Sequence, residues 1–164
     1  MFTTGAEKVQ RVTIIPRGQA LGVTVQASEE DKRLLTREEL EAKLATLLGG
    51  MAAEEIFFGD NKVTTGPSSD IEQVRKISLL MVKKFGMSDK VGPIGYDERT
   101  GISPDTARLM DQESRKIVKA VYEKVKALII AKRGNLENLA AQLEEKETLN
   151  GQEVRQALGL NPNS

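Results

Sequence analysis

Two spacings of apolar residues occur along this chain, and each predicts a different kind of element. Near the N-terminus, residues 12–15 and 21–26 are short runs rich in β-branched side chains, separated by a proline- and glycine-containing spacer at 16–19. Such runs around a turn-rich spacer are typical of a small β-hairpin. Beyond residue 36 the apolar residues recur every three or four positions, which is the spacing of amphipathic helices.

The first helical segment is predicted at 37–57. Thr36 followed by Glu39 has the pattern of a capping box, in which the two side chains satisfy backbone N–H groups at a helix start. A turn at 64–70, rich in Thr, Gly, Pro and Ser, then leads into a second apolar stripe that stops at Gly86. We therefore expect a second helix whose start carries two serines and an aspartate.

The C-terminal half has the strongest helical pattern. Between 105 and 133 there is neither proline nor glycine, so a long helix is predicted there, with Gly134 ending it. Asn135 is predicted to cap a shorter helix, and Asn150 with Glu153 forms another capping box before a last helix. We expect this half to be entirely helical and the whole chain to be α+β, mostly helical.

Length and composition favour one soluble domain over residues 1–164. Its parts are a β-hairpin region at 8–34, two helices at 36–86 and a C-terminal helical part at 105–160. Lys and Arg together number 24, as do Asp and Glu, and aromatic residues make up only 4%. A zero net charge and few aromatic side chains argue against a nucleic-acid partner, and no apolar run is long enough to predict a membrane span or a secretory signal.

Candidate chemistry is limited by the absence of histidine and cysteine. Imidazole and thiolate are the preferred zinc ligands, and the histidine- and cysteine-based nucleophilic sites are excluded as well. A serine with a lysine base remains formally open, since Ser68 and Ser69 precede a helix. The favoured interpretation is structural, because serine and aspartate at such positions usually accept hydrogen bonds from unpaired N–H groups. Seven basic residues between 115 and 133, interleaved with Glu113 and Glu123, are interpreted as a solvated helix face.

Four sequence blocks carry a resemblance to a known family. They are VTIIPRG at 12–18 with ALG at 20–22, LGGMAAEEI at 48–56 with FG at 58–59, VTTGPSSD at 63–70, and FGMS at 85–88 with GP at 92–93; a weaker fifth is LEEKETL at 143–149. In order and spacing these resemble the peptidase domain of the FtsH family of ATP-dependent zinc metalloproteases. Met51 stands where the family usually has arginine.

The resemblance implies a helical bundle behind the hairpin, of the kind found in a zinc peptidase domain that follows an AAA ATPase. Family members form membrane-anchored hexameric rings on the cytoplasmic, stromal or matrix side and degrade unfolded or membrane proteins. By the same resemblance, Asp70 occupies the position of the third zinc ligand. The family's two histidine ligands and catalytic glutamate lie on a His-Glu-x-x-His helix, and this sequence contains no such motif.

Three hypotheses follow. The first is a non-catalytic remnant or interaction subunit, with no catalytic residue and no cofactor of its own, that forms a homo-oligomer or associates with full-length FtsH-type subunits. The second is a fragment of an active ATP-dependent zinc metalloendopeptidase whose catalytic helix and ATPase lie outside this chain. The third is an unrelated helical binding module, which requires the motif blocks to be accidental. Independently of these hypotheses, Glu54 and Glu55 can be interpreted as exposed helix formers and Asp70 as a cap of its helix.

Overall fold

The computed structural model describes residues 8–16, 23–26, 34–97 and 101–160. The chain divides into two compact units, one formed by Met1–Leu34 with Ile129–Ser164 and the other by Leu35–Leu128. Most of the predicted 16–19 turn and the loop before Thr36 lie outside the described residues. The single domain at 1–164 stays a prediction.

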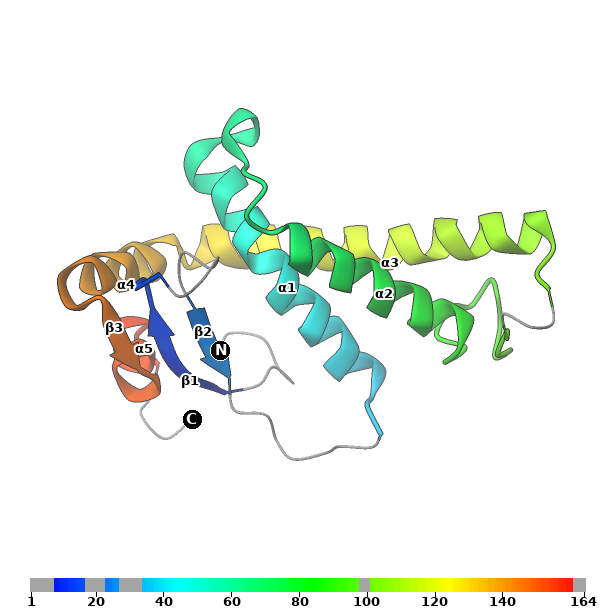
Figure 1. The fold of residues 1–164 in the computed structure, drawn as a ribbon, viewed down its shortest axis with the longest axis horizontal. Helices are drawn as coiled ribbons and strands as arrows, with labels where there is room; N and C mark the ends of the chain where they lie inside the picture. Colours follow the sequence, from blue (N-terminus) through cyan, green and yellow to red (C-terminus); the bar gives the residue numbers. More distant parts are fainter. Residues whose placement is uncertain (1–7, 17–22, 27–33, 98–100, 161–164) are drawn as a thin grey trace. The chain divides into compact units, whose positions relative to one another are not determined.

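The first unit contains a three-stranded antiparallel sheet (Figure 1). Its strands are β1 (Val9–Thr13), β2 (Val23–Gln26) and β3 (Thr148–Asn150), in the order β2-β1-β3. Pairing of β1 with β2 confirms the predicted hairpin. The third strand corrects the expectation that the C-terminal half is entirely helical: β3 is a strand because it pairs with β1, and the hydroxyls of Thr13 and Thr148 lie 2.8 Å apart.

Among the helices that the structure describes, α4 (Arg133–Lys146) and α5 (Gly151–Ala157) lie wholly in this unit. The prediction that Gly134 ends the long helix and that Asn135 caps the next one is wrong, because both residues lie inside α4. The side-chain amide of Asn135 instead donates to the Leu158 carbonyl oxygen at 2.9 Å, a contact that no local pattern encodes. A small apolar core joins the elements: Leu143, Leu149, Val154 and Leu158, with Val12, Leu136, Leu139 and Leu160 packed against them.

The start of α5 confirms the second predicted capping box. Asn150 accepts hydrogen bonds from the N–H groups of Gln152 and Glu153, and its own N–H donates to the Glu153 carboxylate. Three residues before this cap, Glu147 ends α4 in the left-handed conformation, with φ of 59°. That conformation favours glycine, so Glu147 is a strained position in a short connection.

The second unit is helical. It contains α1 (Arg37–Phe58), the short 3-10 helix η1 (Asp60–Lys62), α2 (Ser68–Lys83) and most of α3 (Pro104–Ala131). The capping box at the start of α1 is present as predicted, with the Thr36 and Glu39 side chains bonded to each other's backbone N–H groups. The mostly helical α+β fold is thus confirmed. None of the described helices combines the length and the apolar character needed to cross a bilayer.

The core of this unit lies between the three long helices. The completely or almost completely buried apolar side chains are Leu44, Leu48 and Ala52 from α1, Val74, Met81 and Val82 from α2, and Met110 and Val121 from α3. A polar pair lies among them, since the hydroxyls of Ser78 and Ser114 are 3.0 Å apart and both residues are buried. Each hydroxyl therefore has a partner, which removes most of the cost of burying it.

Candidate metal-ligand position and its surroundings

Asp70 lies in the first turn of α2 and is half-buried. A carboxylate is favoured there by the partial positive charge of the helix N-terminus. Within the described part of the chain its side chain makes no hydrogen bond and no ion pair. Its two oxygens therefore keep their capacity to accept a hydrogen bond or to bind a cation.

The turn before Asp70 is held from the end of α1 by Glu54. One carboxylate oxygen of Glu54 accepts from the Thr64 backbone N–H at 2.7 Å, and the other accepts from the Thr64 hydroxyl at 3.0 Å. The same hydroxyl oxygen accepts from the Gly66 N–H at 3.1 Å. Hydrogen bonds to an ionised carboxylate are among the stronger ones, so Glu54 fixes the backbone that leads to Asp70.

Glu55 points to a different partner, the helix α3. Its carboxylate accepts from the Tyr122 hydroxyl and from Lys126, whose Nζ lies 3.3 Å away. The tyrosine hydrogen bond is the main reason that the pKa of Glu55 lies below its ordinary value. Burial, followed by the bond to Glu55, raises the pKa of Tyr122, and hydrogen bonds to Glu123 and Glu55 raise that of Lys126. All these shifts favour the protonation states that keep the cluster together at neutral pH.

The interpretation of Glu54 and Glu55 as plain exposed helix formers is therefore wrong. Both carboxylates are half-buried and have defined partners. Their place in the AAEE block is the signal by which the sequence points to them. Tyr122 and Lys126 carry no such signal, because they meet Glu55 across 67 and 71 residues of chain.

The prediction that serine or aspartate side chains cap α2 is also wrong. The capping position is occupied by Pro67, and no side-chain hydrogen bond closes this helix end. Ser68 and Ser69 are both exposed, and within the described residues no lysine is bonded to either hydroxyl. A serine nucleophile with a lysine base therefore has no geometric support.

The residues present do not fit a complete zinc site. Zinc binds three or four nitrogen, sulfur or carboxylate ligands, yet this sequence has neither histidine nor cysteine. Among the residues that the structure describes, no three acidic side chains come close enough to hold a metal ion. Asp70 is thus a single carboxylate in the position that the resemblance assigned to a ligand.

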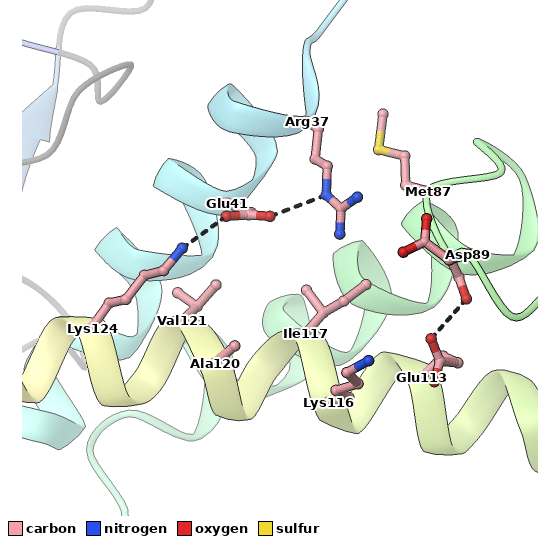
Figure 2. Close-up of a pocket in the computed structure, with 11 residues that line it drawn as sticks. Arg37, Glu41, Met87, Asp89, Glu113, Lys116, Ile117, Ala120, Val121 and Lys124 are labelled. Atoms are coloured by element: carbon pink, nitrogen blue, oxygen red, sulfur yellow. Dashed lines mark hydrogen bonds and ion pairs between the residues drawn. The ribbon is translucent and has the colours of Figure 1, made fainter.

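A separate hollow of about 120 Å³ lies in the same unit, and Figure 2 shows its lining. Its floor is apolar, formed by Ile117, Ala120 and Val121 of α3. The charged groups around it are Arg37, Glu41, Asp89, Glu113, Lys116 and Lys124. Asp70 does not line this hollow.

Most acidic groups around this hollow are already paired. The Glu41 carboxylate lies 3.2 Å from Nε of Arg37 and 3.4 Å from Nζ of Lys124 (Figure 2). The buried Glu113 carboxylate accepts from the Ser88 hydroxyl at 2.9 Å. The placement of Glu113 corrects the interpretation of a wholly solvated face, because only 6% of this residue is exposed. These pairs join α1 and the segment after α2 to α3, and their geometry is that of structural contacts.

Sequence similarity assigns this chain to a known protein family. The model of peptidase family M41 matches residues 1–157. This chain belongs to peptidase family M41. The resemblance to the FtsH peptidase domain is thereby confirmed.

Proteins similar to this chain occur in several organisms. The chain is 37% identical to "ATP-dependent zinc metalloprotease YME1 homolog" of Caenorhabditis elegans, with 96% of the chain and 23% of that protein aligned. It is 42% identical to "ATP-dependent zinc metalloprotease FtsH 3" of Conexibacter woesei, covering 98% of the chain and 22% of the relative. It is also 42% identical to "ATP-dependent zinc metalloprotease FtsH" of Thermotoga maritima, with 93% of the chain and 27% of that protein aligned. The chain thus spans about a quarter of the length of these relatives.

Proposed function

We propose that this chain, with the sequence printed, is a non-catalytic M41 peptidase domain that acts through association with other subunits. The supporting observation is its ligand set: Asp70 is a lone carboxylate, and histidine and cysteine are absent. A peptidase that uses zinc needs several ligands together with a general base for the metal-bound water. A domain with one of these groups binds zinc weakly and cleaves no peptide bond.

Zinc content is the direct test. The purified chain is dialysed against a chelator, re-supplied with zinc, desalted and measured by elemental analysis, alongside a casein-cleavage assay. We expect far less than one zinc per chain, no cleavage, and the same values for Asp70→Asn. One zinc per chain that is lost in Asp70→Asn would overturn the proposal, because Asp70 would then belong to a working site.

A second candidate function is supported by a different observation. The Asp70 carboxylate is unpartnered in the described structure, while Glu54 holds the turn before it in place. A carboxylate that is held in place and has no partner is suited to bind a metal ion when the other ligands are present. In this hypothesis the chain is part of an ATP-dependent zinc metalloendopeptidase, the activity in its relatives' names, and the remaining ligands and ATPase lie outside it.

The coding sequence upstream of Met1 discriminates between the two candidates. An in-frame His-Glu-x-x-His motif there supports the peptidase, and its absence supports the non-catalytic domain. If the motif is present, the longer protein is expressed with Asp70→Asn and with the control Asp105→Asn, since Asp105 is also in the first turn of a helix. Zinc retention falls only in Asp70→Asn if Asp70 is a ligand.

In this proposal the chain carries out its function by associating with other M41 subunits. The partners would be further copies of this chain or complete FtsH-type subunits in a ring, at a membrane, where unfolded or membrane proteins are the substrates. Native mass spectrometry of the chain, alone and mixed with a complete M41 protease, tests this. A chain that stays monomeric in both samples contradicts the interaction role.

A further inference from the structure

The junction between β3 and α5 contains a reactive dipeptide. Asn150 followed by Gly151 is the single Asn-Gly pair in the sequence. In such a pair the backbone nitrogen of the glycine can attack the asparagine side chain, because glycine has no Cβ to hinder the approach. Asn150 is exposed to water, whereas Gly151 is buried.

The capping box holds the Asn150 side chain away from this reaction. Its Oδ1 accepts from the N–H groups of Gln152 and Glu153 at 2.9 and 3.0 Å, while its own N–H donates to the Glu153 carboxylate at 2.9 Å. The backbone of Asn150 is extended, with ψ of 169°. Closing a ring between the side chain and the next nitrogen requires rotation about ψ, which breaks the contacts of Oδ1.

The sheet restrains the other half of the pair. Asn150 is paired with Arg11 in the register of β3 and β1. A Cβ placed on Gly151 would lie only 2.2 Å from the Val9 carbonyl oxygen, so the glycine backbone is packed tightly against β1. The rotation that the reaction needs therefore requires α5 to separate from β1.

We propose that Asn150 is a deamidation site gated by the folding of the first unit. In the opened chain the deprotonated Gly151 nitrogen attacks Cγ of Asn150, a C–N bond forms, and the side-chain nitrogen leaves as ammonia. Water then opens the resulting succinimide at either carbonyl, which gives an aspartyl or an isoaspartyl residue. No oxidant or enzyme is required, and water is the only co-reactant.

The two products have different consequences for the fold. An aspartyl residue keeps side-chain oxygens that accept the same two N–H hydrogen bonds. An isoaspartyl residue adds a methylene to the main chain between β3 and α5 and has no side chain of the correct length for the cap. Opening of this unit thus becomes a permanent change for the chains that form the isoaspartyl product.

Peptide mapping by mass spectrometry tests the gate. The full chain is incubated at mildly alkaline pH in graded urea, and deamidation at Asn150 is compared with Asn138, which precedes leucine inside α4. A synthetic peptide with the sequence of residues 147–155 gives the unprotected rate. We expect the native chain to react much more slowly than the peptide, and its rate to rise as urea unfolds the first unit. Equal rates in the native chain and the peptide would overturn the proposal.

Glu153→Ala weakens the gate without altering the reacting pair. Removing one half of a capping box raises the population of the opened helix start, and with it the reaction rate, about fivefold. The matched control is Glu144→Ala, an exposed glutamate on α4 with no capping role, for which no change is expected. If Glu153→Ala is unfolded, its rate must equal that of the peptide; a folded Glu153→Ala with the wild-type rate refutes the gate.

Discussion

Gly151 offers the sharpest test of how the start of α5 packs against β1. In Gly151→Ala the new methyl carbon would lie 2.2 Å from the Val9 carbonyl oxygen and 3.3 Å from that of Gln10. The first distance is far inside van der Waals contact, and both obstructing atoms belong to main chain. No rotamer change can relieve the overlap, so α5 has to move away from β1.

The magnitude follows from two opposing terms. Overpacking a tight site costs about 1–3 kcal/mol, and the upper value applies here because backbone must move. Alanine in place of glycine also lowers the entropy of the unfolded chain, which returns up to about 1 kcal/mol. The net loss in free energy of unfolding is therefore about 2 kcal/mol, which lowers the Tm of a unit this small by roughly 10 °C.

Gly134→Ala is the matched control in the same unit. Gly134 lies in the first turn of α4, and nothing is within 4 Å of the position that its Cβ would take. Alanine should stabilise this helix by about 0.5–1 kcal/mol. Thermal unfolding followed by circular dichroism measures both variants, and hydrogen exchange assigns the effects to the first unit. A Gly151→Ala protein as stable as wild type would refute the packing argument.

Three further predictions concern single glutamate residues. Glu54→Ala should speed hydrogen exchange at 64–70 roughly tenfold, because bonds to an ionised group are lost; unchanged protection would mean the turn holds itself. Glu147→Gly should raise the free energy of unfolding by about 0.5–1 kcal/mol in urea titrations by relieving the left-handed φ, and a loss would contradict this strain. The hydrogen bond from the Asn150 backbone N–H is the main cause of the lowered pKa of Glu153. The ionised Glu153 carboxylate therefore stabilises the fold fully at pH values above 4.5, the ordinary pKa of a glutamate. That stability is lost as pH falls through the lowered pKa, and Glu153→Gln should show a flatter acid-side Tm profile; identical profiles would argue against the linkage.

Asp70 shows how far the sequence could lead toward the candidate site. The resemblance marked its position, and the turn signal before it correctly predicted a helix start. The role of Glu54 in holding that turn was not predicted, because helix spacing alone gives no partner for a side chain. Helix spacing likewise places Glu113 on a solvated face, whereas the structure buries it and bonds its carboxylate to Ser88, 25 residues away in the sequence.

The sequence by itself determined the features that depend on neighbouring residues or on residue types alone. The capping boxes at Thr36 and Asn150 were predicted and found, because each is closed by residues within one helical turn. The lack of zinc ligands other than carboxylates also follows directly from the sequence. Only the tertiary structure decided that residues 148–150 form a strand, that Asn135 bonds to Leu158 and that Glu55 meets Tyr122. Each of these contacts joins segments far apart in the chain, and its free energy is gained only when the intervening residues have folded.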